Sequence, residues 1–379
     1  MTAATTERQG AGARAAELAR ALVSPRGAVF LLLAILLIAI TALNPSFAEP
    51  GQFIRFIQRV APVAIVAIGQ FFVIVGGEFD LSMGSVVTAQ VVIAGNLIGQ
   101  DDRLALPVLA LMLGFGALIG LINGLIVAYL KVPSFIATLG MMLALLGGVL
   151  FWTGGAATGN PADSFREIGR GGIRDLPVIE ILPWSVVVLA VILAAAIWFS
   201  RRPFGRTIVA LGDNATTARY SGLRADRVKI TTFVLSALSA TIAGVLLVGY
   251  AGVHPSVGRG YEFIAITAVV LGGVVLGGGR GWVVGAVAGA FALEALFTLL
   301  NFAGVPSTYR DAVQGAIIII AVAYSATTFR ARRSGPAAQA SSASAAKGPD
   351  ATASDRPAPP PSTPKAQPHT VQNDTKGGS

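Results

Sequence analysis

Six polar side chains stand inside long apolar stretches of this sequence. They are Glu78, Asp80, Asn96, Asn123, Glu294 and Asn301. A charged group at the centre of a bilayer costs roughly 2.5 to 3.5 kcal/mol on insertion scales, so such residues are functional candidates by default. Acids and amides at such depths can contact a polar solute, and an acid can also take up a proton.

Asp80 and Glu294 differ in their settings. In the segment GGEFDLSMGS (76–85), Gly76 and Gly77 permit an irregular turn, and Asp80 is placed to cap the following helix by accepting its first N–H groups. Direct contact of Asp80 with a substrate is the alternative. Glu294 lies deep in an apolar run and should face protein or a wet cavity, either as a buried protonated side chain or as part of a pathway.

The elements that must position these groups are membrane helices. Apolar residues make up 54% of the chain, charged residues only 12%, and the mean hydropathy is +0.71, whereas soluble domains carry about 25% charged residues. Long runs without period-2 alternation favour helices over barrel strands. We therefore predict an all-α polytopic membrane bundle of about ten transmembrane helices. The runs are 28–43, 57–76, 81–99, 105–130, 134–153, 182–200, 230–251, 263–279, 282–301 and 311–328.

Lys and Arg predict the orientation of this bundle, because cytoplasmic loops are enriched in them. With the N-terminus inside, inner segments hold sixteen basic residues and outer segments hold seven. Both ends are therefore predicted to be cytoplasmic. We expect a polar segment at 1–27, a permease domain at 28–330 and a disordered tail at 331–379, whose Ala, Ser, Pro and Thr cannot build a core.

Glycines recur every four residues in two places. This spacing puts small residues on one helix face, where another backbone can approach closely. We expect both series to serve packing within the bundle or a dimer contact. The first series is Gly116, Gly120 and Gly124, and the second is Gly277, Gly281, Gly285 and Gly289.

Motifs of soluble enzymes are missing. The sequence has no G-x-x-x-x-G-K-[S/T] phosphate loop, no H-E-x-x-H zinc helix and no G-x-S-x-G nucleophile elbow. It has no cysteine, and its two histidines, His254 and His369, are far apart. We expect no catalytic residue, metal or cofactor, and any nucleotide-driven step would need another subunit.

One long basic segment, 201–229, separates two of the apolar runs. Asp213 or Asn214 can cap a short helix that continues through Tyr220, and Gly222 can end it. Such a helix would present Tyr220 as an aromatic anchor and Arg219 as an ion-pairing group, residue types enriched at interface hot spots. The alternative is that the positive charge only sets topology.

Four segments resemble the membrane subunit of ABC importers in the branched-chain amino acid and monosaccharide permease family, closest to ribose-, xylose- and arabinose-type sugar permeases. They are GGEFDLSMGS (76–85), VPSFIATLGMM (132–142), FGRTIVALGDNATTARYSGL (204–223) and GYEFIAITAVVLGGVVLGGGRG (260–281). The resemblance implies a bacterial cytoplasmic-membrane protein surrounded by lipid, paired with a second permease subunit as a homodimer or heterodimer. It also implies ATP-binding cassette ATPase subunits and an extracytoplasmic substrate-binding protein as partners, and no nucleic acid.

By this resemblance, the segment from Asn214 to Gly222 corresponds to the helix that couples the permease to its ATPase. The residues so implied are Asn214, Ala218, Arg219, Tyr220, Ser221 and Gly222. The third and eighth helices are implied to lie near the translocation path. Two departures from the sugar-permease pattern, Glu78-Phe79 before Asp80 and Glu294 where a small residue is usual, put the identity of the sugar in doubt.

Our hypothesis is that the permease forms a low-affinity passage for an uncharged monosaccharide, a pentose or hexose, and that recognition resides mainly in the binding protein. The candidates for lining this passage are Gly77, Asp80, Asn123, Phe135, Thr138 and Glu294. Within the family, a nucleoside or a branched-chain amino acid is the competing substrate. Outside it, a proton-coupled transporter that uses Glu294, or a membrane-embedded enzyme, is the alternative.

Overall fold

The computed structural model describes residues 27–177, 179–306 and 308–333. Contacts divide the chain into a large unit that ends at Thr328 and a small unit that begins at Phe329. The fold described below is that of the large unit. The predicted polar segment 1–27, except for its last residue, and nearly all of the predicted tail 331–379 lie outside the described residues.

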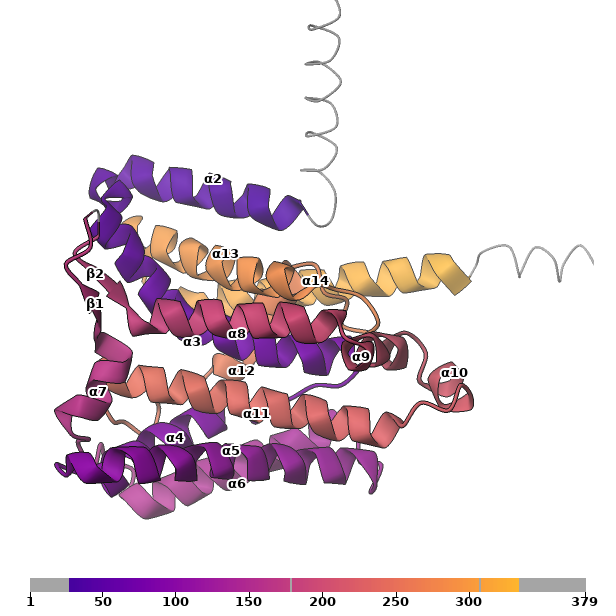
Figure 1. The fold of residues 1–379 in the computed structure, drawn as a ribbon. Coiled ribbons are helices and arrows are strands. Elements are labelled where there is room, and N and C mark those ends of the chain that lie inside the picture. Colours follow the sequence, from indigo (N-terminus) through magenta and orange to yellow (C-terminus); the bar gives the residue numbers. More distant parts are fainter. Residues whose placement is uncertain (1–26, 178, 307, 334–379) are drawn as a thin grey trace, which may run out of the picture. The chain divides into compact units, whose positions relative to one another are not determined.

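Helices make up most of the described chain (Figure 1). The first half contains α2 (Ala28–Leu43), η1 (Pro45–Ala48), α3 (Pro50–Val75), α4 (Met83–Ile98), η2 (Asp102–Leu104), α5 (Ala105–Ala128), α6 (Ser134–Thr153) and α7 (Asp163–Arg170). The second half contains α8 (Trp184–Arg201), α9 (Pro203–Asp213), α10 (Ala215–Tyr220), α11 (Ala225–Tyr250), α12 (Tyr261–Leu271), α13 (Val283–Phe302) and α14 (Tyr309–Arg333). Each of the ten predicted apolar runs overlaps one of these helices.

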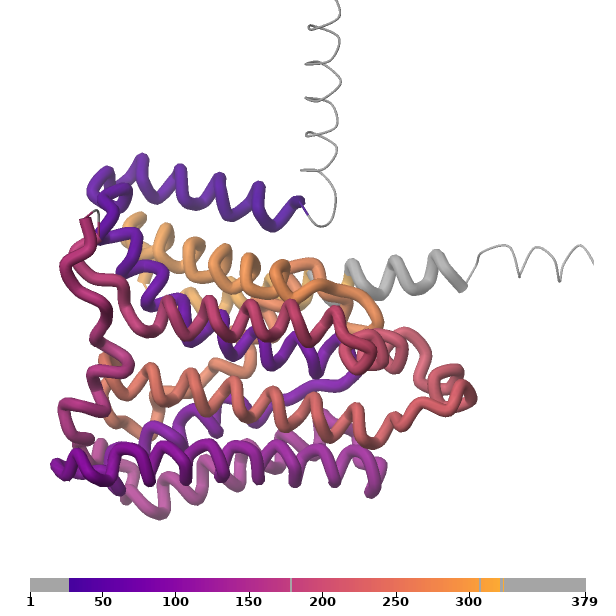
Figure 2. Tube along the Cα trace, in the orientation of Figure 1, coloured from indigo at the N-terminus to yellow at the C-terminus, as the bar shows by residue number. Residues whose placement is uncertain are grey.

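Two helices form the centre of the bundle. Every side chain of α3 from Val60 to Val75 is buried, and α11 packs against α3, α4 and α5 (Figure 1). Helices from distant parts of the sequence also lie side by side, as α2 does with α13 (Figure 2). By contrast, only a small part of α5, α6 and α8 is buried, and most of their apolar side chains are at least partly exposed. Such surfaces suit lipid or a second membrane subunit.

Six described helices are long and apolar enough to cross a membrane: α3, α5 with η2, α6, α8, α11 and α13. The apolar helices α2, α4 and α12 are shorter. Helix α12 has 11 residues and rises about 16 Å, which is only about half of the roughly 30 Å hydrocarbon core. The run 263–279 is therefore not one spanning helix, which corrects the sequence prediction.

The second glycine series is also wrong as predicted. Gly277 and Gly281 lie in the irregular segment after α12, and only Gly285 and Gly289 share a helix, α13. The physical reason is backbone geometry: Gly278 and Gly279 have φ values of +83° and +70°, which a continuing helix does not allow.

The first glycine series packs as predicted. A methyl group added at Gly120 would lie 2.6 Å from the Phe233 carbonyl oxygen, and one added at Gly124 would lie 2.6 Å from Ile230 Cα. Both neighbours belong to α11, so the small residues let the backbones of α5 and α11 approach closely.

One small sheet departs from the predicted all-α fold. Strands β1 (Gly172–Arg174) and β2 (Ile181–Pro183) pair antiparallel, with Ile173 opposite Leu182. They follow α7 in the long connection between α6 and α8. Strands of three residues are too short to show an alternating pattern, so sequence periodicity could not find them.

Candidate functional site

Helix α10 is the short helix that the basic segment predicts. Asn214, not Asp213, is its cap, because its Oδ1 accepts the Thr217 N–H at 2.9 Å while Asp213 ends α9. At the other end, Gly222 has φ +79°, its N–H donates to the Arg219 carbonyl, and the Leu223 N–H donates to the Ala218 carbonyl. These two bonds form a Schellman motif, the usual left-handed glycine termination of a helix.

The surface of α10 suits contact with another protein. Tyr220 is 90% exposed, and Arg219 and Ser221 are also exposed. Ala218 is buried where α10 packs on α9 and α11. Helix α10 is thus hydrogen-bonded at both ends, and it presents an exposed aromatic ring and an exposed guanidinium.

Asp80 lies at the centre of a buried hydrogen-bond network in the interior. Its Oδ2 accepts the Ser236 hydroxyl at 2.6 Å, and its Oδ1 accepts the Ser82 N–H at 2.9 Å and the Ser82 hydroxyl at 2.6 Å. Asn123 Nδ2 donates to the Ser82 hydroxyl at 2.9 Å. Asp80 is not the N-cap that the sequence predicts, because α4 begins at Met83 and Ser82 is its flanking residue. Its carboxylate instead joins the start of α4 to α11.

Helix α6 contacts the same segment from another side. Thr138 Oγ1 accepts the Leu81 N–H at 3.1 Å, and Ser134 Oγ accepts the Phe79 N–H at 3.1 Å. Because Thr138 is buried, it lies on the inward face of α6, whereas Phe135 is 54% exposed. The structure therefore brings Asp80, Asn123 and Thr138 together and leaves Phe135 on the surface of the described chain.

Glu78, one of the departures from the sugar-permease pattern, forms an ion pair with Lys229 in the first turns of α11. Both side chains are mostly buried. The pair fixes the irregular segment after α3 to the end of α11 that lies next to α10. In this structure Glu78 therefore has a structural partner.

Three chain segments meet at a backbone junction beside this ion pair. The Gly279 N–H donates to the Val75 carbonyl at 2.8 Å. Gly212, in the last turn of α9, lies so close that a methyl group on it would overlap the Val75 carbonyl oxygen and come within 2.6 Å of Gly279 N. Gly77, with φ +85°, approaches Gly212 as well. We call this contact of Val75, Gly77, Gly212 and Gly279 the glycine junction.

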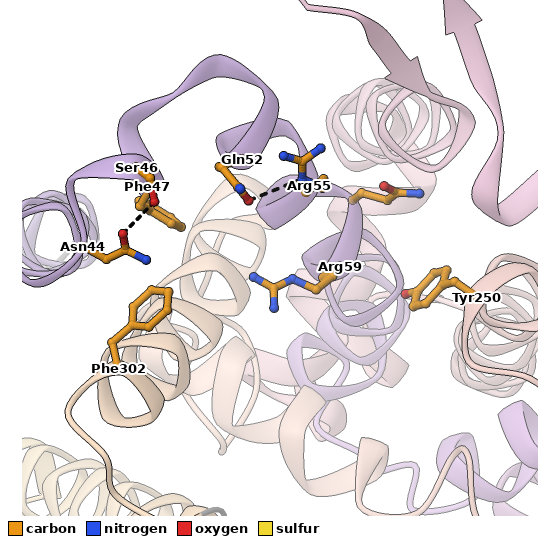
Figure 3. A pocket seen from close by; sticks show the side chains of 9 residues that line it. Asn44, Ser46, Phe47, Gln52, Arg55, Arg59, Tyr250 and Phe302 are labelled. Carbon is orange, nitrogen blue, oxygen red and sulfur yellow. Dashed lines mark hydrogen bonds between the residues drawn. The ribbon is translucent and has the colours of Figure 1, made fainter.

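Glu294 lies away from the Asp80 network, in a pocket of about 260 Å³ among α3, α13 and α14. Arg59, Asn301 and Arg310 also line this pocket. A neighbouring pocket of about 500 Å³ shares Arg59 and Phe302 with it (Figure 3). The larger pocket is lined by Asn44, Ser46, Phe47, Gln52, Arg55, Gln58, Arg59, Tyr250 and Phe302.

Sequence reasoning missed several residues of these sites. Ser236 and Ser134 are ordinary hydroxyl residues in apolar helices, and no local pattern marks them as partners of the segment around Asp80. From the sequence, Arg59 is only one of the seven basic residues on the outer side, although its position within the predicted run 57–76 could have marked it as a candidate. In the described part of the chain, no three His, Asp or Glu side chains gather as metal ligands would.

Comparison with known proteins identifies the family. The family described as "Branched-chain amino acid transport system / permease component" matches residues 52–322. The ribose import permease protein RbsC of Bacillus subtilis is 38% identical over 299 residues, which is 77% of this chain and 90% of that protein. RbsC of Escherichia coli K12 is 36% identical over 297 residues, with 76% and 90% coverage.

A third relative is named for a different substrate. The autoinducer 2 import system permease protein LsrC of Klebsiella pneumoniae is 32% identical over 291 residues, which is 76% of this chain and 83% of that protein. No solved structure matches the chain significantly. The matched family covers more than half of the sequence, so the chain belongs to the branched-chain amino acid transport system permease family and is a multi-pass permease of the cell membrane.

Proposed function

We propose that this chain is the transmembrane subunit of an ATP-binding cassette importer that moves a monosaccharide, a pentose or hexose, into a bacterial cell. The observation that carries the proposal is the 38% and 36% identity to two ribose import permeases across 90% of their lengths. A separate ATPase subunit supplies the energy, an extracytoplasmic binding protein delivers the sugar, and a second permease subunit completes the passage. That second subunit is either another copy of this chain or a different permease.

Uptake into proteoliposomes tests this function. The permease reconstituted with its ATPase should take up D-ribose or a related sugar only when ATP and the loaded binding protein are both supplied. ATP-independent uptake that an uncoupler abolishes would instead favour proton coupling through Glu294. The family description favours a branched-chain amino acid as the alternative substrate. Thermal stabilisation of the binding protein by leucine but by no sugar would support that alternative.

The proposed topology has ten spanning segments within 28–330, one of which is α12 together with the irregular residues that follow it, and cytoplasmic segments at 1–27 and 331–379. It places α10 in the cytosol and the turn between α2 and α3 outside. Because the chain has no cysteine, a single Cys can report on each side. Ser221→Cys should react with an impermeant maleimide only after the cells are opened. The matched Ser164→Cys, exposed on α7, should react in intact cells, and the reverse pattern would refute the topology.

Helix α10 is the proposed contact with the ATPase, through Arg219, Tyr220 and the glycine-terminated turn at Ser221 and Gly222. Exposure of the Tyr220 ring and the fixed ends of the helix support this assignment. Paired Arg219→Ala and Tyr220→Ala substitutions should lower ATPase recovery in pull-downs by about tenfold or more, because hot-spot truncations cost about 2 kcal/mol or more.

Thr216→Ala is the matched control for this pair, since Thr216 is exposed on the same helix and no ATPase contact is assigned to it. The double variant should insert and fold like the wild type, because the side chains of Arg219 and Tyr220 are exposed and do not pack in the bundle. Unchanged ATPase recovery with the double variant would argue strongly against docking on α10.

The proposed translocation path includes Gly77, Asp80, Asn123, Phe135, Thr138 and Glu294. Asp80, Asn123 and Thr138 are close together and buried in this structure, which suits a closed section of such a path. Glu294 lines a pocket near the other end of α11. Phe135 lies on the exposed side of α6, so its inclusion depends on a second subunit covering that surface.

A further inference from the structure

The two adjoining pockets at the α2–α3 turn form one polar space, which we call the outer vestibule. They share Arg59 and Phe302, and their volumes are about 500 and 260 Å³. In Figure 3 the Arg59 guanidinium extends toward Asn44 and Phe302, and Tyr250, another lining residue, points its hydroxyl toward the helix that carries Arg59. Helix α11 runs from α10 to Tyr250, so the vestibule lies at the opposite end of the bundle from α10.

The charges of the vestibule do not balance. Arg55, Arg59 and Arg310 line it, and Glu294 is its only acidic lining residue. Within the described chain, none of these guanidiniums lies within 4.0 Å of a carboxylate oxygen. Arg55 Nε donates only to Gln52 Oε1, at 3.3 Å, and Arg310 lies over the Phe297 ring. The space therefore carries an excess of positive charge.

A neutral pentose offers no counter-charge for this excess. Guanidinium groups pair with carboxylates through two parallel N–H···O bonds, and these charge-assisted bonds are roughly twice as strong as neutral ones. Amide, phenol and carboxylate groups such as those of Asn301, Tyr250 and Glu294 can bind hydroxyl groups. An apolar ring, that of Phe302, completes the lining. These groups together match a polyol that also bears an acid.

We propose that the outer vestibule binds a monosaccharide that carries a carboxylate, such as an aldonic or uronic acid, with Arg59 as the anchor of the carboxylate. Arg55, which is exposed like Arg59, adds to the positive field, and the hydroxyl-binding groups line the same two pockets. This inference rests on the proposed function for the sugar class and narrows that class to sugar acids. It makes the permease itself a point of selection, in addition to the binding protein.

Equilibrium binding to the full-length permease in nanodiscs tests the proposal. The probes are D-ribonate, D-ribose and acetate, which separate the sugar acid from the neutral sugar and from the bare anion. D-Ribonate should bind at least about tenfold more tightly than D-ribose or acetate. Arg59→Gln should remove this preference, and Arg59→Lys, which keeps the charge without the planar fork, should retain part of it.

Arg103→Gln is the matched control, because Arg103 is exposed on the same proposed side of the membrane and does not line the vestibule. Equal binding of ribonate and ribose, equal binding of ribonate and acetate, or no binding of any probe would each overturn the proposal. So would an Arg59→Gln variant that keeps the preference for ribonate while losing the binding protein in pull-downs, since Arg59 would then pair with a protein carboxylate.

Failure of this inference differs from failure of the proposed function. The binding assay contains only the permease, whereas the proposed function is tested by ATP-dependent sugar uptake with all subunits present. Uptake of neutral sugars together with no preference for ribonate would refute the inference alone. Absence of any ATP-dependent sugar uptake would refute the proposed function.

Discussion

A Gly212→Ala permease is expected to lose nearly all transport while its neighbour Gly277→Ala transports normally. The added methyl group at Gly212 would overlap the Val75 carbonyl oxygen and lie 2.6 Å from Gly279 N. Both obstacles are backbone atoms, so no side-chain rotation relieves them. The overlap must separate the segments and break the bond from Gly279 N to Val75 O. Overpacking of this kind costs about 1–3 kcal/mol.

The consequence for transport follows from the position of the glycine junction. Gly212 lies in the last turn of α9, the helix that leads directly into α10, Val75 ends α3, and Gly279 follows α12. If a conformational change in the ATPase moves α10, the glycine junction is the first contact through which that movement reaches the buried helices. Separating it should uncouple ATP hydrolysis from uptake, so we expect at least about a tenfold fall in sugar taken up per ATP hydrolysed.

Gly277→Ala is the matched control for Gly212→Ala. Gly277 belongs to the same glycine-rich segment as Gly279. Its φ is not positive, and a methyl group on it would meet no atom within 4 Å. Both variants should be compared in reconstituted vesicles, with ATPase activity and uptake measured on the same samples. Normal coupling in Gly212→Ala, or equal loss in Gly277→Ala, would show that the junction does not transmit the motion.

Much of the helical fold was predictable from the sequence because hydrophobic runs dominate it. Each predicted run overlaps a helix, and residue type alone marked the end of α10 at Gly222 and limited its cap to Asp213 or Asn214. The segment after Leu271 was misread because Val and Leu continue the apolar pattern while the glycines change the backbone. Hydropathy reports the surroundings of side chains, and it does not report whether φ stays helical.

The candidate site was less predictable because its contacts are long-range. Asp80 was found as a buried acid, but its partner Ser236 is 156 residues away, and serine is common in membrane helices that show no such contact. The vestibule brings together Arg55 and Arg59 in the first turns of α3, Arg310 in the first turn of α14, and Glu294 on α13. Only the packing of α3, α13 and α14 brings these residues together. A single sequence carries no signal for that packing.

Asp80→Ala should be the most damaging substitution in the buried network. The Asp80 side chain is fully buried and accepts three hydrogen bonds from Ser82 and Ser236. Alanine would leave the buried Ser82 N–H and two hydroxyls without their acceptor. An unsatisfied buried polar group costs about 1–3 kcal/mol. We expect a loss of about 3 kcal/mol or more in the free energy of unfolding, together with loss of uptake.

A graded series separates the network from a simple cavity effect. Asp80→Asn keeps one acceptor oxygen, and its amide can donate to a serine hydroxyl that rotates to accept, so it should lose only about 1 kcal/mol. Ser236→Ala removes one bond and leaves the Ser82 contacts, so it should fall between Asp80→Asn and Asp80→Ala. Unfolding of the purified permease in detergent gives the stabilities, and uptake gives the function. If Asp80→Asn retains stability but not uptake, the carboxylate acts on the path itself, because the helix contacts would then be intact. If all three variants match the wild type, the network neither holds α4 against α11 nor contributes to transport.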